Sequence, residues 1–574
     1  MRNLFVTLLA GVLLLSGCSR EEPRQATIPS ASADFAQFVD DYFDAAFRYS
    51  PSTATYVGIH DHDAKLNDMS RAAYEARIQQ LRGFLDRLGA IDRASLGFDE
   101  RVDAEALEMQ IRASLYDLDT LRGWERNPMS YVAVPGGALD GLVKRDFAPA
   151  SERLASVTSR LSQVPAVFEA AKANVKNPPR EFTDLAIRMS RGSVGYLEGT
   201  LAAWAKEAAA GDEKLLAEFT AANATAIAAA KSFTEWLEND LLPDSKGDFA
   251  IGAEAFSARL RYEDMVEMPL AEVLAIGEAQ LERDYQAFVE TARLIDPNRP
   301  PAEVMKSLAD EHPTAEDLIP SVQRSVEEAR QFLVDRDIVT IPSEVRVTVT
   351  ETPPYARSGS FASMSTPGPF ETKATEAFYY VTPVQPEWGD EQKQQHLRFY
   401  NPYAVAMVNV HEAYPGHYLQ FLYAPQFPTK VRKLVGSGTN SEGWAHYTER
   451  MMVEQGFGDG DPKYRLAQLQ MALLRDCRYV AGIKLHTEGW TVERAAKELF
   501  EEKCFQEPAN AYEEARRGTY NPTYLYYTLG KIQVQQLRDE YMKEKGATLK
   551  QFHDAFVAQG ALPIPLVRRI LLEQ

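Results

Sequence analysis

The sequence HEAYPGH at residues 411–417 places two imidazoles and one carboxylate within seven residues. In a helical His-Glu-x-x-His motif, two histidines one turn apart bind zinc, and the glutamate beside the first histidine acts as general base. Here His417 follows His411 by six positions, which puts the two imidazoles about 120° apart on an ideal helix. Pro415 and Gly416 can interrupt the helix and turn His417 toward the same ion. The alternative is a Pro-Gly helix end with two ordinary histidines.

A second motif, SEGWA at residues 441–445, offers a third ligand, Glu442, from a separate helix. Together, HEAYPGH and SEGWA resemble a bacterial family known as domain of unknown function 885, which is grouped with the gluzincin metallopeptidases. The resemblance runs from about residue 32 to the C-terminus. It implies a mostly helical fold and peptide hydrolysis, with Zn²⁺ as cofactor, His411, His417 and Glu442 as ligands and Glu412 as catalytic base.

His446 leaves the ligand set open. It lies four residues after Glu442 and therefore on the same helical face. It would replace His417 as the second ligand if the Pro-Gly break did not turn His417 inward. We favour His417 because the family resemblance includes it.

The N-terminus has the pattern of a bacterial lipoprotein. An apolar run at residues 4–15 is followed by Ser16-Gly17-Cys18, which resembles a lipobox. We therefore predict a signal peptide at 1–17, acylation of Cys18 and a lipidated tether at 18–31. This predicts an anchor in the cell envelope, at the periplasmic face of the outer membrane, with the membrane contacted through the lipid.

The rest of the chain, 32–574, is predicted to be one helical metallopeptidase-like domain, because it contains neither a Gly/Ser-rich linker nor a repeat of fixed period. Formal net charge is −20, from 62 basic and 82 acidic residues, which argues against nucleic acid as a partner. Cys477 and Cys504 could pair in an oxidising periplasm, although spacing cannot show that they meet. His60 and His62 lie in a polar connection; they could bind metal, but we expect solvated loop histidines. The oligomeric state stays open.

The predicted fold is mainly α with a small antiparallel β-sheet. Apolar residues recur at three and four positions through most of the domain, as in amphipathic helices. Between about 343 and 383 the period changes to two, with Val345, Val347 and Val349 alternating with polar residues. We expect this sheet beside the metal helix, which should open at Asn401-Pro402, and the metal site within about 405–450.

Polar side chains in the C-terminal part are candidates for substrate contacts. Arg475, Arg478 and His486 belong to one predicted helix, and Tyr524 and Tyr527 to another that should open at Asn521-Pro522. By analogy with helical metallopeptidases, His486 and Tyr527 are candidate catalytic donors to an oxyanion, and the candidate substrate-binding residues are Arg475, Arg478 and Tyr524. Structural salt bridges and core packing are the alternatives.

These patterns favour a zinc-dependent hydrolase, a metallopeptidase that acts on short periplasmic peptides. The sequence lacks a Gly-x-Ser-x-Gly elbow and a phosphate-binding Gly-x-x-x-x-Gly-Lys run. Two alternatives remain: a non-catalytic lipoprotein that binds peptides or metal, and a zinc hydrolase of amide or ester bonds outside peptides.

Overall fold

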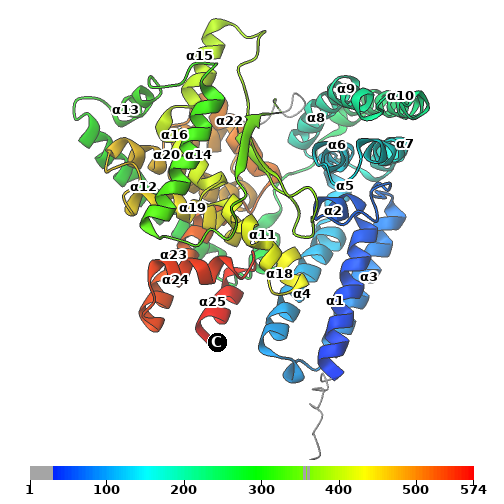
Figure 1. Cartoon of the computed structure of the whole chain (residues 1–574), viewed down its shortest axis with the longest axis horizontal. Coiled ribbons are helices and arrows are strands. Elements are labelled where there is room, and N and C mark those ends of the chain that lie inside the picture. Colours follow the sequence, from blue (N-terminus) through cyan, green and yellow to red (C-terminus); the bar gives the residue numbers. More distant parts are fainter. Residues whose placement is uncertain (1–29, 353–356, 358–361, 574) are drawn as a thin grey trace, which may run out of the picture.

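The computed structural model describes residues 30–352, 357 and 362–573. The predicted signal peptide, Cys18 and most of the tether lie outside the described residues. The described chain is mainly helical, which confirms the predicted fold class (Figure 1). None of the described helices combines the length and the apolar character that a bilayer-spanning segment needs.

Long helices at the N-terminus stand beside the C-terminal lobe (Figure 1). The apolar stripe of the first helix packs on the third, where the rings of Phe38 and Phe84 meet edge to face at 5.8 Å. The elements of this part are α1 (Ser30–Tyr49), α2 (Pro51–Tyr56), α3 (Arg71–Ala90), η1 (Arg93–Ser95), α4 (Phe98–Leu115), η2 (Tyr116–Leu121) and α5 (Gly123–Arg126).

A helical bundle with its own hydrophobic core follows. Side chains such as Leu154, Phe168 and Phe233 fill this core, which is separate from the main core of the molecule. Its elements are α6 (Met129–Lys144), α7 (Ala150–Asn174), α8 (Arg180–Glu198), α9 (Thr200–Ala208), α10 (Glu213–Trp236), η3 (Leu237–Leu241) and η4 (Leu242–Asp244).

The C-terminal lobe contains most of the main core. A disulfide between Cys477 and Cys504 joins two of its segments, so the two cysteines whose pairing the sequence left open do meet. The helices of this lobe are α11 (Gly252–Asp264), α12 (Leu270–Ile295), α13 (Pro301–Leu308), α14 (Leu318–Arg336), α15 (Asp390–Phe399), α16 (Pro402–Glu412), α17 (His417–Tyr423), η6 (Ala424–Gln426), α18 (Lys430–Leu434), α19 (Gly438–Glu454), α20 (Pro462–Thr487), α21 (Val492–Ala495), η7 (Ala496–Glu501), α22 (Pro508–Tyr520), α23 (Tyr526–Lys545), α24 (Leu549–Val557) and α25 (Ile564–Glu573).

The small sheet lies beside α16, as predicted, because Val405 of that helix shares a small apolar cavity with Ala362 and Tyr379 of the sheet. Its strands are β1 (Val347–Glu351), β2 (Ala362–Ser365) and β3 (Ala377–Val381), in the order β1-β3-β2. The prediction of an antiparallel sheet is wrong for one pairing, since β3 is antiparallel to β2 but parallel to β1. Side chains alternate with period two in both kinds of pairing, so the sequence pattern could not distinguish them.

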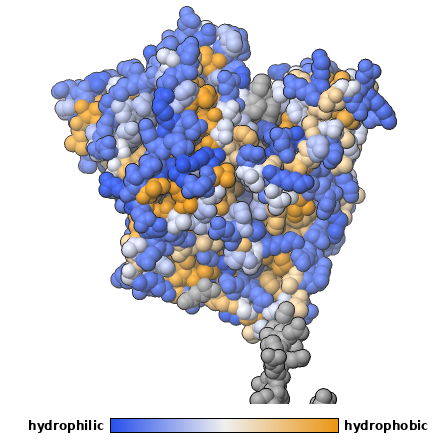
Figure 2. All heavy atoms as spheres, viewed as in Figure 1, coloured by the Kyte–Doolittle hydropathy of each residue, from blue (hydrophilic) through white to orange (hydrophobic). Residues whose placement is uncertain are grey.

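The surface in Figure 2 is mostly hydrophilic, with apolar side chains in separate patches. This agrees with the strongly acidic composition of the chain.

Candidate metal centre

The predicted helix break forms at the Pro-Gly pair. Asn401 caps the start of α16, its Oδ1 accepting from the Ala404 N–H at 3.0 Å, and the helix ends at Glu412. A new helix, α17, begins at His417. The N–H of Gly416 donates to the Val410 carbonyl at 2.9 Å, and a Cβ at position 416 would overlap the carbonyl oxygen of His411. Only glycine therefore fits this turn.

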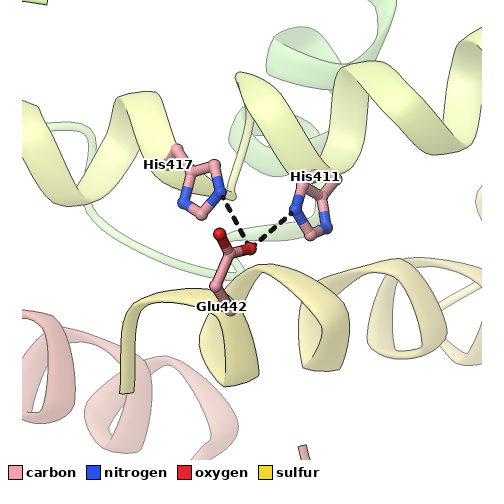
Figure 3. Close-up of side chains that lie close together, drawn as sticks. All are labelled: His411, His417 and Glu442. Carbon is pink, nitrogen blue, oxygen red and sulfur yellow. Dashed lines mark ion pairs between the residues drawn. The ribbon is translucent and has the colours of Figure 1, made fainter. Parts of the chain in front are cut away.

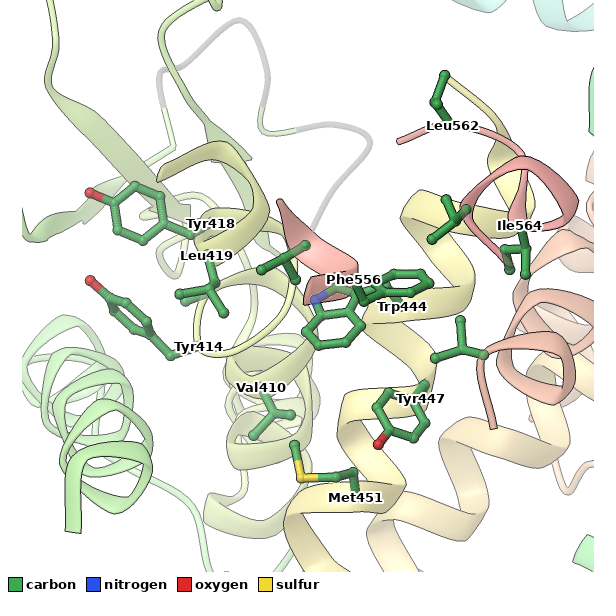
Figure 4. Packing of buried hydrophobic residues seen from close by; sticks show 14 of the residues in the cluster. Val410, Tyr414, Tyr418, Leu419, Trp444, Tyr447, Met451, Phe556, Leu562 and Ile564 are labelled. Atoms are coloured by element: carbon green, nitrogen blue, oxygen red, sulfur yellow. The ribbon is translucent and has the colours of Figure 1, made fainter. Parts of the chain in front are cut away.

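Trp444 of the SEGWA motif fastens this break to α19. Its indole Nε1–H donates to the Pro415 carbonyl at 2.9 Å, and its ring stacks on Phe556 at 5.3 Å (Figure 4). Trp444 is fully buried, as is Tyr414 on the other side of the turn. The second motif thus supplies both a carboxylate for the site and a side chain that fixes the turn before His417.

Two glycines bring α19 and α23 into close contact. A Cβ at Gly443 would lie only 2.5 Å from the Cα of Gly530, and one at Gly530 would overlap the carbonyl of Thr439. Gly443 follows Glu442, and Gly530 lies one turn after Tyr527 on α23. The close contact therefore positions Tyr527 near the site, with its ring centroid 6.4 Å from that of His411.

His411, His417 and Glu442 converge on one point (Figure 3). One potential ligand atom from each residue lies within 4.8 Å of those of the other two. Glu442 Oε2 is 3.3 Å from His411 Nε2 and 3.4 Å from His417 Nε2. That oxygen is buried and accepts no hydrogen bond. Two imidazole nitrogens and one carboxylate oxygen form a donor set that suits zinc.

Glu449, which the sequence analysis missed, supports His411 from behind. Its Oε1 lies 2.7 Å from His411 Nδ1 and 3.0 Å from an Arg475 guanidinium nitrogen, and the carboxylate is fully buried. Such a contact fixes the tautomer and the ring orientation of a metal-binding histidine. The available signal was its position, seven residues and two helical turns after Glu442.

The charges at the site favour a cation. Burial and the Arg475 charge oppose protonation of His411, but its contacts with Glu442 and Glu449 outweigh them and raise its pKa to about 9. Burial likewise opposes ionisation of Glu442, yet His411 and His417 hold its pKa well below the usual range. The two carboxylates thus stabilise positive charge where the imidazole nitrogens meet.

His446 does not belong to the converging set. It is fully buried, and its Nδ1 faces Glu449 Oε2 at 3.4 Å. Burial, with a smaller contribution from the Lys531 charge, lowers its pKa to about 3. Of the two candidates for second ligand, His417 is the one that the structure brings to His411 and Glu442.

Two of the candidate catalytic groups, Glu412 and Tyr527, have no hydrogen-bond partner among the described residues. The Glu412 carboxylate has neither a hydrogen bond nor an ion pair with any residue that the structure describes, and its charge adds to burial in raising the pKa of Tyr379 on β3. The Tyr527 hydroxyl also has no hydrogen-bond partner in the described ranges. Its ring lies under the guanidinium groups of Arg475 and Arg478, at 5.6 and 5.4 Å.

The remaining predicted residues have internal partners. His486 Nε2 lies 2.8 Å from the Gly518 carbonyl and its Nδ1 accepts from the Ile251 N–H at 3.4 Å. It lies eleven residues after Arg475 on α20, about 16 Å along the helix, so the structure does not bring it to the three ligands. Arg478 forms a bidentate pair with Glu514, both contacts at 2.7 Å.

Tyr524 lies outside the helix in which it was predicted. The helix begins at Tyr526 rather than at Asn521-Pro522, so that prediction is wrong by four to five residues. Tyr524 instead packs against Gly482 of α20, is fully buried, and donates its hydroxyl to the Glu514 carbonyl at 3.3 Å. Residues 522–525 form a turn before the helix.

Comparisons with known proteins agree with the fold. A family profile described as "Bacterial protein of unknown function (DUF885)" matches residues 51–571. A Shewanella oneidensis chain described as a candidate lipoprotein of unknown function is 27% identical, with a TM-score of 0.78 over 94% of this chain and 99% of that one. A candidate lipoprotein from Colwellia psychrerythraea is 17% identical, with a TM-score of 0.80 over 95% and 99%. No curated protein matches the sequence.

Proposed function

The chain belongs to the bacterial family of unknown function DUF885, and we propose that it is a zinc-dependent hydrolase, a metallopeptidase of the gluzincin type that acts on short peptides. The observation that carries this proposal is the convergence of His411, His417 and Glu442, with Glu412 next to His411 in the chain. The Glu442 oxygen that lies between the two imidazoles is buried without a hydrogen bond, and the three donor atoms around this point suit zinc.

The residues present fit a zinc ion. Three protein ligands leave a coordination position open, which is the pattern of catalytic rather than structural zinc sites. The ion would supply Lewis acidity toward the scissile carbonyl. Glu449 would hold the His411 ring in place, and Arg475 would hold Glu449, so we assign Arg475 to positioning rather than to substrate binding.

Glu412 and Tyr527 are the groups that would move or stabilise charge. Glu412 follows His411 at the end of α16. As general base, its carboxylate would take a proton from the attacking water and return it to the leaving amine. Tyr527 lies close enough for the Glu442 charge to add to burial in raising its pKa, so the phenol stays protonated and can donate. Its hydroxyl would stabilise the developing oxyanion.

We also propose that the protein is lipid-anchored in the cell envelope through Cys18. The lipobox-like Ser16-Gly17-Cys18 supports this, as does the description of the similar Shewanella oneidensis chain as a candidate lipoprotein. The Cys477–Cys504 disulfide fits an oxidising compartment outside the cytoplasm. Cys18→Ser should release the protein from membranes, and wild-type recovery in the membrane fraction would contradict the anchor.

The decisive experiment replaces Glu412 by Gln, which keeps the shape of the side chain and removes the base. Glu412→Gln should fold, keep its zinc and bind peptide, while turnover of a mixed peptide library falls by roughly 10²- to 10⁴-fold. Glu454→Gln is the matched control, because Glu454 lies exposed at the end of α19 and its one ion pair within the described part of the chain is with Arg450.

Each other outcome has a definite meaning. Loss of zinc from Glu412→Gln would make Glu412 a ligand and the ligand set wrong. If zinc-loaded wild type cleaved amides or esters but no peptides, the hydrolase would act outside peptides. If it cleaved nothing in a broad panel and the substitution changed nothing, a binding lipoprotein would be the better explanation.

A further inference from the structure

Residues 366–376, which connect β2 to β3, leave the sheet and pack on the N-terminal helices; we call this segment the strap. Gly368 of the strap lies so close to the turn after α2 that a Cβ on it would overlap the backbone of Val57. The N–H of Phe370 donates to the Val57 carbonyl at 3.0 Å. Backbone therefore meets backbone at this contact, with no side chain between the two segments.

The strap links the two hydrophobic cores of the molecule. Ala374 is buried in the core of the helical bundle, and Ala377, three residues later on β3, is buried in the main core. Arg145, directly after α6, donates to the Glu376 carbonyl at 2.9 Å and to the Ser365 hydroxyl at 3.1 Å. It thus contacts both ends of the strap, which joins the bundle to the sheet beside α16.

His60 binds the middle of the strap. Its Nε2 lies 3.0 Å from Oε2 of Glu371 in the strap, and its Nδ1 lies 2.9 Å from Oδ2 of Asp63. A neutral imidazole has a single N–H and can donate to only one of these carboxylates, whereas the protonated ring donates to both. Both contacts together therefore require the proton.

When His60 loses this proton, the contact with Glu371 is the one that we expect to break. Asp63 lies three residues after His60, and its N–H donates to the His60 carbonyl at 3.3 Å, so the local turn keeps the two side chains together. Thr55 donates to the other Asp63 oxygen at 2.5 Å. Glu371 comes from 311 residues away, and its carboxylate would then face a ring nitrogen that has no proton to donate.

The other charged groups around the strap have partners of their own. Arg145 holds the two ends, and Arg160 of α7 donates to the Thr55 hydroxyl at 2.7 Å. Lys433 of α18 lies over an aromatic ring of the strap, 5.5 Å from its centroid. These three groups keep their charge through the range in which histidine titrates, and the two carboxylates ionise at lower pH. The charge that changes with pH near neutrality at this contact is therefore that of His60.

We propose that the strap is a proton-dependent link between the helical bundle and the sheet, held while His60 is protonated and loosened when the ring becomes neutral. Burial opposes protonation of His60, but its hydrogen bonds to Asp63 and Glu371 outweigh burial and raise its pKa above the ordinary value. The strap is thus held at low pH and loosens as the pH rises through that pKa. Because β3 lies beside α16, loosening releases one end of the sheet next to the metal helix. The link does not depend on the chemistry proposed for the metal centre.

Amide hydrogen exchange of the strap tests this proposal, because opening exposes the Lys373 and Ala374 N–H groups that donate to Glu371 Oε1. His60→Gln imitates the neutral ring, since glutamine can donate a hydrogen bond but does not titrate. At the same pH, the strap of wild type should exchange more slowly than that of His60→Gln near pH 6, by up to about fivefold, the size expected of a partly exposed ion pair. The difference should shrink toward about pH 8.5.

Glu371→Gln removes the charge from the other side of the contact, and its strap should also exchange faster than that of wild type near pH 6. His62→Gln is the matched control, because His62 lies in the same turn and forms no ion pair with a described residue; its strap should exchange as in wild type. Equal exchange in wild type, His60→Gln and Glu371→Gln would overturn the proposal, as would a difference that does not change with pH. Exchange is measured without turnover, so failure of the hydrolase proposal would leave this result unaffected.

Discussion

Two histidines of this protein each lie between two carboxylates, and the two sites differ in geometry. At His60, both ring nitrogens have a hydrogen-bond partner. Its Nδ1 is 2.9 Å from Asp63 and its Nε2 is 3.0 Å from Glu371, both at hydrogen-bond length. Asp63 also accepts from the Thr55 hydroxyl at 2.5 Å, and Glu371 accepts from the Lys373 N–H at 2.8 Å. When the imidazole carries a proton on both nitrogens, each nitrogen donates to a carboxylate and the hydrogen bonds of this cluster are satisfied.

At His411, the two ring nitrogens are not equally satisfied. Its Nδ1 has a hydrogen-bond partner in Glu449, but its Nε2 is 3.3 Å from a Glu442 oxygen that also lies 3.4 Å from His417. That oxygen accepts no hydrogen bond although it is buried. Three donor atoms thus converge on one point, which is the arrangement that a cation satisfies and a proton does not.

The comparison shows that residue types alone do not define a metal site. Both clusters contain a histidine and two carboxylates, and in both the histidine pKa is raised. The second imidazole and the oxygen without a donor distinguish the His411 cluster. Substitutions should therefore affect the two clusters differently.

The largest expected difference concerns zinc. Binding free energies of zinc sites are on the order of 10 kcal/mol, so removal of one of three ligands should cost on the order of 3–4 kcal/mol, roughly 10²- to 10³-fold in affinity. His411→Ala should show this loss in competition with a chelating dye, whereas His60→Ala should bind zinc as wild type does. His417→Ala should weaken zinc more than His446→Ala; the reverse order would make His446 the second ligand.

A smaller effect is expected from the carboxylate behind His411. Glu449→Gln keeps a hydrogen-bond acceptor for Nδ1 but removes its charge, and outer-shell substitutions typically cost 10- to 100-fold in metal affinity. The corresponding change at the other cluster, Glu371→Gln, should leave zinc affinity unchanged. An unaltered zinc affinity in Glu449→Gln would mean that Glu449 serves only as the partner of Arg475.

Local patterns predicted much of the fold and part of the site. The Asn401 cap and the Pro-Gly break each depend on neighbouring residues, so the start of α16 and an interruption before His417 could be predicted. The parallel pairing of β1 with β3 could not, because strand direction depends on how the chain returns to the sheet.

The contacts that could not be predicted were mainly those between residues far apart in the sequence. His60 was expected to be solvated, but its imidazole is only partly exposed and both its nitrogens contact carboxylates, the second from Glu371, 311 residues away. Glu449 was missed for the same reason. Its position two turns after Glu442 was a signal in the sequence, but its contact with His411 is visible only when the neighbouring helices are in place.

The smallest expected effect is a pH dependence at the His60 cluster. Burial opposes protonation of His60, but the hydrogen bonds to Asp63 and Glu371 outweigh it and raise its pKa above the ordinary value of 6.5. The folded state therefore binds this proton more tightly than the unfolded chain. The resulting stabilisation is fully present below about pH 6.5 and is lost as the pH rises through the higher pKa of the folded protein. Because the imidazole is partly exposed, we expect less than about 1 kcal/mol.

His60→Gln tests this contribution, because glutamine can form hydrogen bonds but does not titrate in this range. The difference in Tm between metal-free wild type and His60→Gln should be largest near pH 6 and shrink toward pH 8.5. Titration of His411 is common to both proteins and cancels from the difference. His312→Gln is the control, since the His312 ring contacts the Pro313 carbonyl rather than a carboxylate. A Tm difference that stays constant or grows with pH would show that His60 stabilises the fold by packing against Phe147, on which its ring stacks at 3.6 Å, and not through its charge.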